Sequence, residues 1–331
     1  MKVFKNLVKT AFFLTLIGIT LISCSDDDEI PNPPVVPEPS NTIADFVSNN
    51  EDYSILLEAL QAADGGLDAV LSGEGPFTVF APNNAAFAAF LSANNFNALS
   101  DIPTDVLSQV LLNHVVNGNA VSSSLTTGYE VSSLSTATPN GNNLSLYINT
   151  ADGVVINGVS KVTTADVSVD NGTIHAVDAV IGLPTVVTFA AADPNFTILV
   201  SALTRADLTF DYVKTLSTAN GTDPAPFTVF APIDQAFLDL LEELGVNSLE
   251  EIDEPTLNAT LKMHAVANAN VLASDLSDGL KISTLGGDIT ANVTDDGATL
   301  TDANDRVSNI IAVNVQASNG VIHAIDKVIL K

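Results

Sequence analysis

From residue 41 to about residue 114, apolar residues recur at helical spacing both before and after one short, continuous apolar run. Apolar residues three or four positions apart predict amphipathic helices within Ile43–Leu60 and Val106–Leu111. Between them, Phe77–Phe80 predicts a short buried strand that stops at Pro82, because proline cannot donate to a sheet ladder. This part is therefore predicted to hold one strand among helices.

Beyond His114 the pattern changes to short runs rich in β-branched residues. An Asp-Gly pair at residues 152–153 separates Leu144–Ile148 from Val154–Ile156, which predicts a hairpin with a tight turn. An Asn-Gly pair at residues 171–172 separates Val167–Val169 from Ile174–Val180 and predicts a second turn between strands. Helices first and strands later predict an α+β unit.

The same unit occurs twice along the chain. Pro76–Pro82 recurs letter for letter as Pro226–Pro232, and Asn171–Asp178 recurs with small changes as Asn319–Asp326. The repeats predict domains at residues 41–184 and 185–331. Each copy is long enough to bury a core of its own.

Comparing the two copies yields three local expectations. Asn83 or Asn84 can cap the helix after the first copy's strand, and Asp234 is predicted to take that capping place in the second copy. The second copy holds about seven extra residues, which we place in the polar loop Lys214–Pro224. The join near Leu183–Thr185 has no Gly/Ser run, so we expect fairly close and restricted contact between the domains.

A basic and apolar leader precedes the copies. It begins with Lys2, Lys5 and Lys9 and continues with the apolar run Ala11–Ile22. This run is shorter than the ~20 residues that a membrane span needs. Basic residues followed by a short apolar run are typical of a secretory signal peptide, which we predict at residues 1–23. The run ends in Leu-Ile-Ser-Cys, which resembles the lipobox of bacterial lipoproteins. The resemblance implies a lipid on Cys24, the only cysteine. The alternative is a buried or free thiol after an uncleaved helix.

Residues 24–40 are predicted to form an acidic and proline-rich tether. Ser25–Glu29 is similar to the tag that sends lipoproteins of some Gram-negative bacteria to the outer face of the outer membrane. Periplasmic retention, or a merely solvated acidic run, is the alternative. Ile30–Ser40 contains five prolines, which favours an extended, semi-rigid spacer.

Composition excludes several classes of protein. The chain has 39 acidic and 11 basic residues and a formal charge of −28, so neither nucleic acid nor an anionic membrane surface is an expected charge partner. The first copy has 14 acidic residues and Lys161 as its single base. One cysteine excludes a disulfide scaffold and any multi-cysteine metal site.

The repeated boxes resemble those of the fasciclin family. Its first box is similar to Phe77–Phe87 and Phe227–Phe237, and its last box to Asn171–Val180 and Asn319–Val328. The resemblance implies an α+β chain of two tandem fasciclin-like domains, each a compact wedge-shaped β-sandwich of about seven strands with packed helices. It also implies adhesion, not catalysis. The box and histidine residues expected to be structural are Phe77, Thr78, Phe80, Pro82, Phe87, His114, Asn171, Gly172, His175, Asp178, Phe227, Thr228, Phe230, Pro232, Phe237, His264, Asn319, Gly320, His323 and Asp326.

The region between the boxes departs from the family pattern. The family often has an aromatic–histidine pair there, and the matching positions are Asn113-His114 and Met263-His264. Because the aromatic residue is absent from both copies, the resemblance does not support the integrin partner of animal members.

The four histidines and the acidic loops are the candidates for chemistry. No Gly-x-Ser-x-Gly elbow occurs, and His175 and Asp178 are three apart on an alternating strand, so we expect structural histidines and no enzyme. Each copy has two histidines but no carboxylate at a fixed spacing from them, which is weak evidence for a transition-metal site. Asp302–Arg306 starts like a calcium loop, but Arg306 occupies a ligand position and no glycine follows. A turn-rich acidic loop is favoured, and no cofactor is expected.

Two functions remain as hypotheses. The first is a surface-anchored adhesion or extracellular interaction protein that contacts a cell-surface or matrix protein or glycan. The second is a polysaccharide- or matrix-polymer-binding accessory lipoprotein for nutrient capture. With no tryptophan and four tyrosines, sugar stacking has few aromatic platforms, which favours adhesion. The predicted location is the outer membrane, facing the cell exterior, with the periplasmic face as the alternative.

Overall fold

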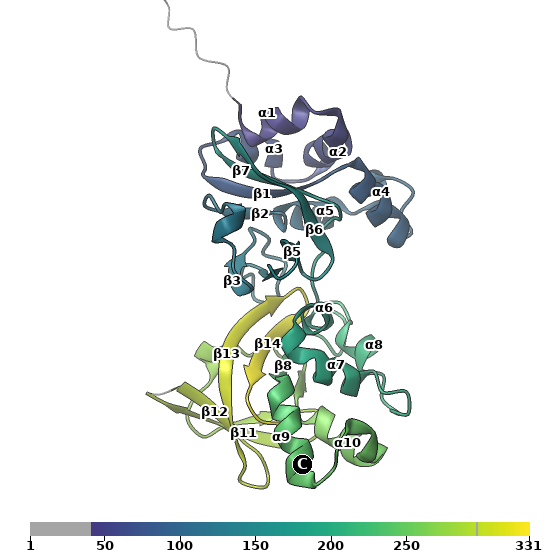
Figure 1. Cartoon of the computed structure of the whole chain (residues 1–331), viewed down its shortest axis with the longest axis vertical. Helices are drawn as coiled ribbons and strands as arrows, with labels where there is room; N and C mark the ends of the chain where they lie inside the picture. Colours follow the sequence, from purple (N-terminus) through teal and green to yellow (C-terminus); the bar gives the residue numbers. More distant parts are fainter. Residues whose placement is uncertain (1–40, 296) are drawn as a thin grey trace, which may run out of the picture. The chain divides into compact units, whose positions relative to one another are not determined.

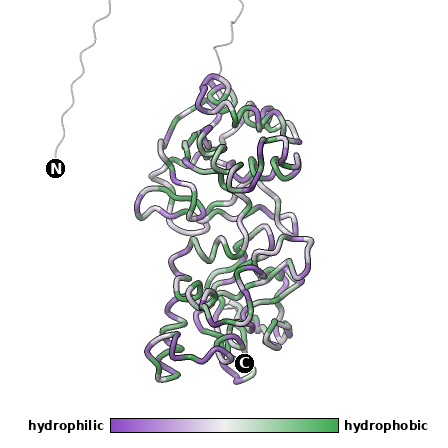
Figure 2. The backbone as a smooth tube through the Cα atoms, turned by 90° about the vertical axis from the view of Figure 1, so that its right-hand side faces the viewer, coloured by the Kyte–Doolittle hydropathy of each residue, from purple (hydrophilic) through white to green (hydrophobic). Residues whose placement is uncertain are grey.

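The computed structural model describes residues 41–295 and 297–331. Cys24 and the leader and tether predicted at residues 1–40 lie outside the described residues. Both copies begin with a capped helix, whose N-caps are Thr42 and Thr185. Figure 1 shows the course of the chain, and Figure 2 shows hydrophilic and hydrophobic stretches interspersed along its backbone.

The first copy places most of its helices before most of its strands, as the pattern predicted. Its helices are α1 (Ile43–Ser48), α2 (Ser54–Ala62), α3 (Leu67–Ser72), α4 (Asn84–Ala93) and α5 (Thr104–Leu112), with 3-10 turns at Glu51–Tyr53, Leu99–Asp101 and Ser122–Ser124. Its strands are β1 (Phe77–Pro82), β2 (Val115–Asn117), β3 (Gly128–Ser132), β4 (Ser145–Asn149), β5 (Val155–Ile156), β6 (Ser160–Val169) and β7 (Gly172–Val177).

The second copy repeats this order of elements. Its helices are α6 (Val186–Ala192), α7 (Thr197–Leu203), α8 (Tyr212–Leu216), α9 (Asp234–Leu244) and α10 (Glu254–Lys262), with 3-10 turns at Pro194–Phe196, Leu249–Glu251 and Ala273–Asp275. Its strands are β8 (Phe227–Pro232), β9 (Ala265–Ala267), β10 (Leu280–Ser283), β11 (Asp288–Thr294), β12 (Gly297–Thr301), β13 (Val307–Ala317) and β14 (Gly320–Ile325).

Each copy forms a seven-stranded sheet, and the strand orders are equivalent: β2-β1-β7-β6-β5-β4-β3 and, read from the other edge, β9-β8-β14-β13-β12-β11-β10. The repeated runs β1 and β8 lie inside their sheets and pair in parallel with β7 and β14. Phe80 lies opposite His175, and Phe230 lies opposite His323. The two boxes of each copy, far apart in sequence, are therefore neighbouring strands.

One long strand in each copy bends, so that a single sheet makes two layers. In β6 the register shifts twice between Val162 and Val167, and Asp166 has a φ of 62°. In β13 the shifts lie between Ile310 and Val315, and Asn314 has a φ of 60°. Bulges of this kind sharpen strand bending and twist. The fold confirms the prediction of two tandem α+β domains with seven strands and packed helices.

Two apolar layers fill each copy. In the first copy, one cluster lies where the helices meet β1 and β7 and includes Leu56, Val79 and Ile174. A second cluster joins β1 and β7 to β4 and β5 and includes Phe80, Leu146 and Ile156. Side chains alternate along β1, so Val79 and Phe80 enter different clusters.

The predicted cap at Asp234 is wrong. The N-cap of α9 is Ile233, and Asp234 is the first helical residue. In the first copy, Asn83 does cap α4, and its side chain accepts from the Ala86 amide. Asp234 instead accepts a 2.7 Å hydrogen bond from the Ile198 amide of α7. Its carboxylate bonds to an amide that is remote in sequence, a partner that local capping rules do not specify.

Only part of the second copy's insertion lies in Lys214–Pro224, the loop in which we predicted it. Leu71 and Leu216 occupy equivalent places, because their carbonyls accept from the equivalent side chains Asn171 and Asn319. Helix α8 therefore includes the start of the predicted loop, and part of the insertion precedes it. The first hairpin also differs from a tight turn, since the paired residues Asn149 and Val155 enclose a longer loop.

The two copies contact each other within the compact unit Ser40–Lys331, as the missing linker predicted. The rings of Tyr129 and Phe189 meet edge to face, with centroids 5.5 Å apart. The Gln316 amide donates to the Ser145 hydroxyl over 2.9 Å. Tyr147 of β4 is buried in the same cluster as Phe189, and burial with the nearby carboxylate of Asp193 raises the pKa of Tyr147 to about 12.

Candidate functional site

An asparagine before the last strand connects three segments of each copy. Asn171 accepts a hydrogen bond from the Ile43 amide at the start of α1, over 2.9 Å. Its amide group donates to the carbonyls of Leu71 and Gly73, at the end of α3. Because all three partners are backbone groups at helix ends, the side chain satisfies groups that helices leave unpaired.

Asn319 makes the same three contacts in the second copy. It accepts from the Val186 amide over 3.0 Å and donates to the carbonyls of Leu216 and Thr218 over 2.8 and 2.9 Å. The side chain is fully buried. The structure therefore gives the repeated Asn-Gly pairs an anchoring role in addition to the turn that the sequence predicted.

His114 and His264 are buried and have both ring nitrogens occupied. Nδ1 of His114 donates to the Val110 carbonyl over 2.7 Å, and its Nε2 accepts from the Ile181 amide over 2.8 Å. His264 bonds in the same way to Thr260 and Ile329, over 2.9 and 3.0 Å. Burial lowers the pKa of both histidines to about 4, so both rings are neutral at pH 7.

His175 and His323 stack on the phenylalanines opposite them. The ring centroids are 5.5 Å from Phe80 and 5.6 Å from Phe230. Nε2 donates over 2.9 Å to the carbonyl of Ala120 in the first copy and of Val271 in the second. The copies differ at Nδ1, which in His175 accepts from an amide and in His323 has no partner among the described residues. Burial lowers the pKa of His323.

The box carboxylates also have structural contacts. Asp178 accepts from the Lys161 amide over 2.8 Å, and Asp326 accepts from the Asn309 amide over 2.7 Å. Gly172 and Gly320 pair with Phe77 and Phe227 in the parallel ladders. These residues stabilise each copy separately, and the described contacts do not bring the two sets of boxes together. The remaining box residues Thr78, Pro82, Phe87, Thr228, Pro232 and Phe237 lie in or directly after β1 and β8 and in α4 and α9.

The positions that replace the family's aromatic residue face the interior. Asn113 and Met263 are both buried, and the Asn113 amide donates to the Gly182 carbonyl over 2.9 Å. Their side chains are therefore not available to a partner.

The calcium-like loop of the second copy is closed by its own backbone. Oδ1 of Asp302 accepts from the amides of Asn304 and Arg306, and Oδ2 accepts from the Leu330 amide over 3.0 Å. The Arg306 guanidinium lies 3.6 Å from the same carboxylate. Within residues 41–295 and 297–331, no group of three or more His, Cys, Asp or Glu side chains is arranged to hold a metal ion.

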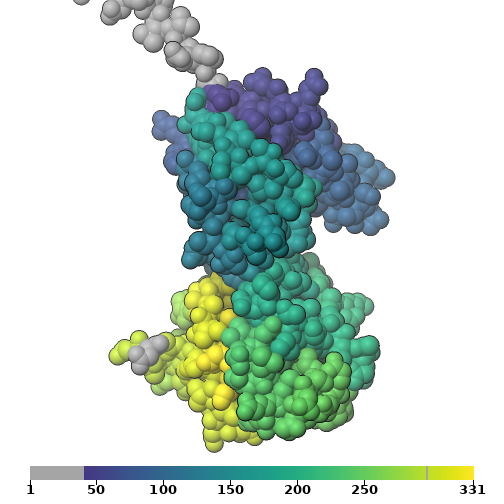
Figure 3. All heavy atoms as spheres, in the orientation of Figure 1, coloured from purple at the N-terminus to yellow at the C-terminus, as the bar shows by residue number. Residues whose placement is uncertain are grey.

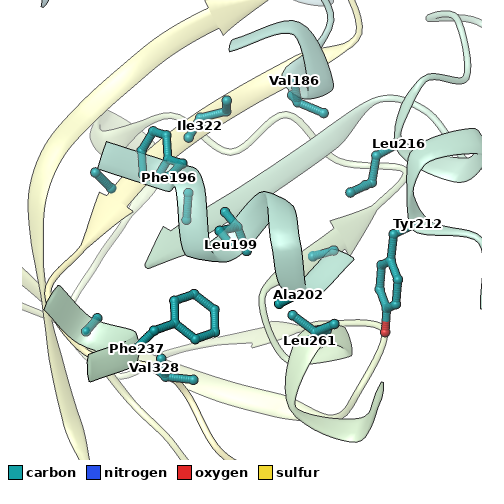
Figure 4. Close-up of a cluster of buried hydrophobic side chains, with 14 of the residues drawn as sticks. Val186, Phe196, Leu199, Ala202, Tyr212, Leu216, Phe237, Leu261, Ile322 and Val328 are labelled. Carbon is teal, nitrogen blue, oxygen red and sulfur yellow. The ribbon is translucent and has the colours of Figure 1, made fainter. Parts of the chain in front are cut away.

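An apolar cavity of about 210 Å³ lies inside the second copy, and sequence reasoning missed it. It is bordered by the helices α6, α7, α8 and α10 and by the strands β8, β9 and β14. Figure 4 shows six of its lining side chains: Val186, Leu199, Tyr212, Leu216, Leu261 and Ile322. The equivalent void in the first copy is about 20 Å³.

In the part of the chain that the structure describes, no single helix has the length and hydropathy of a membrane span. Two consecutive helical segments, Val186–Ala192 and Pro194–Leu203, have the length and hydropathy of a span only when taken together, and their axes meet at a bend of 96°.

Comparison with known proteins identifies the repeated unit. The family described as Fasciclin domain matches residues 51–184 and 194–331. Protein sll1483 of Synechocystis is 40% identical over 140 residues, which cover 42% of this chain and 72% of that protein. Human periostin is 29% identical over 268 residues, which cover 78% of this chain but 29% of periostin.

A solved structure has the same arrangement of elements. It is a FAS1 domain pair from the insect cell adhesion molecule fasciclin I, with a TM-score of 0.51 and 19% identity. The match covers 86% of this chain and 98% of that one, and at this identity it shows the fold alone. Together with the family match to both copies, it shows that this chain belongs to the fasciclin family and carries two fasciclin domains in tandem.

Proposed function

We propose that this protein is a surface-anchored adhesion or extracellular interaction protein. The observation that carries the proposal is the pair of fasciclin domains on one chain. Two copies of one binding unit raise the effective concentration for a repeated partner. The insect protein with the matching fold is described as a cell adhesion molecule.

The charge of the copies suggests the chemistry of the partner. The first copy has Lys161 as its only base, and most acidic side chains of both copies are exposed. A surface with many exposed carboxylates attracts cationic groups. It also attracts divalent cations, which can bridge it to another anionic surface. Salt weakens both attractions. The proposed partner is a cell-surface or matrix protein or glycan.

The second hypothesis, polysaccharide binding for nutrient capture, is supported less well. Stacking on sugars needs an exposed aromatic ring. Tyr53, Tyr147 and Tyr212 are buried, and Tyr129 is half-buried against Phe189. The exposed large apolar side chains of the described residues are all Val, Leu or Ile. Binding to a glycan array, without cell attachment, would favour this second function.

We propose no catalytic role. Of the eight ring nitrogens of the four histidines, seven bond within the fold, and the eighth, Nδ1 of His323, is buried. A general base must reach its substrate, which these rings cannot do without breaking a structural hydrogen bond or leaving the core.

Deleting the gene should lower cell attachment and aggregation, and restoring both copies should recover more attachment than restoring either alone. The reason is that two weak contacts on one chain act together. Attachment to several surfaces is measured at low and high salt, with and without a chelator of divalent ions. Unchanged attachment and aggregation in the deletion strain under all conditions would overturn the adhesion proposal.

We also propose that the chain is anchored by lipid on Cys24 and faces the cell exterior. The proposal rests on the basic-apolar-Leu-Ile-Ser-Cys order and the acidic run Ser25–Glu29. One acyl chain binds a membrane marginally and several anchor it stably, so loss of the lipid should release the protein.

The Cys24→Ser variant should therefore keep its leader and lose the added acyl mass. Intact mass and detergent partition measure the two effects, and Ser25→Ala is the neighbouring control that should behave like the wild type. A Cys24→Ser protein that is still processed and still acylated would contradict the anchor. Protease accessibility in intact cells separates the exterior face from the periplasmic one.

A further inference from the structure

The cavity of the second copy and the small void of the first are the same site. Leu56, Leu71 and Leu111 of the first copy correspond to lining residues Leu199, Leu216 and Leu261 of the second. The volumes are nevertheless about 20 and about 210 Å³. The difference between the copies therefore lies in the other lining positions.

Two valines of the first copy are alanines in the second. Val47 of α1 corresponds to Ala190 of α6, and Val115 of β2 corresponds to Ala265 of β9. All four residues line their respective voids. Each change removes two methyl groups, and a packed interior does not close fully around such a loss.

The residues at the surface opening of the cavity also differ between the copies, and they are less polar in the second copy. In the second copy the opening includes exposed Ala191 and Thr204, and Val213, which is 41% exposed. Ala191 lies in α6, Val213 lies in α8, and Thr204 directly follows α7. These helices form part of the surface in Figure 3. The equivalent positions of the first copy are polar and exposed: Ser48, Gln61 and Asp68. Two of these three positions are apolar in the second copy and none is in the first, so a less polar entrance accompanies the larger apolar interior.

The polar groups in the lining are already occupied. The Tyr212 hydroxyl donates to Asn258 over 2.7–2.9 Å, and the Thr204 hydroxyl donates to the Val200 carbonyl over 2.8 Å. Both nitrogens of His264 are bonded to the backbone. A carboxylate, which needs hydrogen-bond donors, would find no free donor among these groups, and burying it unpaired is unfavourable.

We propose that this cavity binds a small, neutral hydrocarbon ligand that enters between α6, α7 and α8. An engineered apolar cavity of about 150 Å³ binds benzene, so about 210 Å³ admits a larger group, such as an alkyl-substituted ring or a short alkyl chain. The first copy has no such site, because its valines occupy the space.

The test titrates the purified full chain with n-butylbenzene, by calorimetry and by the shift of its thermal transition. We expect saturable binding of one molecule per chain and a rise in Tm with ligand concentration. The charged analogue 4-phenylbutyrate should bind at least about tenfold more weakly at pH 7, since its carboxylate has no partner in the cavity.

Three variants locate the site. The A190V/A265V variant copies the first domain into the second and should lose at least about tenfold in affinity. The V47A/V115A variant makes the reciprocal change and should gain a second binding site per chain. Ala219→Val adds a valine at an exposed loop position outside the lining and should bind like the wild type.

Absence of saturable butylbenzene binding to the wild-type chain would overturn the proposal, and so would equal affinity in the folded A190V/A265V chain. Should V47A/V115A fail to fold, the comparison of wild type with A190V/A265V still decides the matter. If A190V/A265V only raises the Tm and the wild type binds nothing, the cavity is a packing defect and the proposal is wrong.

Discussion

The Asn319→Asp variant should destabilise the second copy by about 3–5 kcal/mol, the range for an uncompensated buried charge. The new carboxylate would still accept from the Val186 amide, but its other oxygen would face the carbonyls of Leu216 and Thr218, which now receive hydrogen bonds. Asn171→Asp should have the same effect on the first copy, through Ile43, Leu71 and Gly73.

Hydrogen exchange followed by mass spectrometry measures the effect in each copy separately. Peptides from the mutated copy should lose protection by far more than peptides from the other copy. Asn220→Asp makes the same chemical change at an exposed loop position and should have little effect. If Asn319→Asp were as stable as Asn220→Asp, the anchoring role of Asn319 would be wrong.

Acidification from pH 6.5 to pH 4 should destabilise each copy by about 3 kcal/mol through one histidine. Burial lowers the pKa of His114 and His264 to about 4, against about 6.5 in the unfolded chain. Between these values the unfolded state binds more protons than the folded state, so stability falls as pH falls. The added proton would also place the Nε2–H of His114 against the Ile181 amide, which now donates to it.

Denaturant titrations at several pH values between 4 and 7 measure this slope. The matched variants are His114→Gln and His264→Gln, which cannot gain charge and should show a flatter dependence on pH, although they are less stable at pH 7. Titration of the surface carboxylates contributes equally to wild type and variants, so the difference isolates the histidines. Equal slopes in wild type and variants would contradict the lowered pKa values.

The sequence alone determined the features that depend on near neighbours. The duplication, the buried strand at Phe77–Phe80 and the turn before Gly172 were predicted correctly, because periodicity and turn residues act within a few positions. The cap at Asn83 was also predicted among its alternatives. At the equivalent place in α9 the local rule failed, since Asp234 bonds to the Ile198 amide of another helix.

Only the tertiary structure decided how distant segments share space. The anchoring of α1 and α3 by Asn171 joins residues about 100 or more positions apart, and no periodic pattern records such a contact. The cavity likewise depends on Ala190 and Ala265 facing one void from separate elements. In the sequence each is an ordinary apolar residue, and their small size matters only because packing brings the two side chains to the same place.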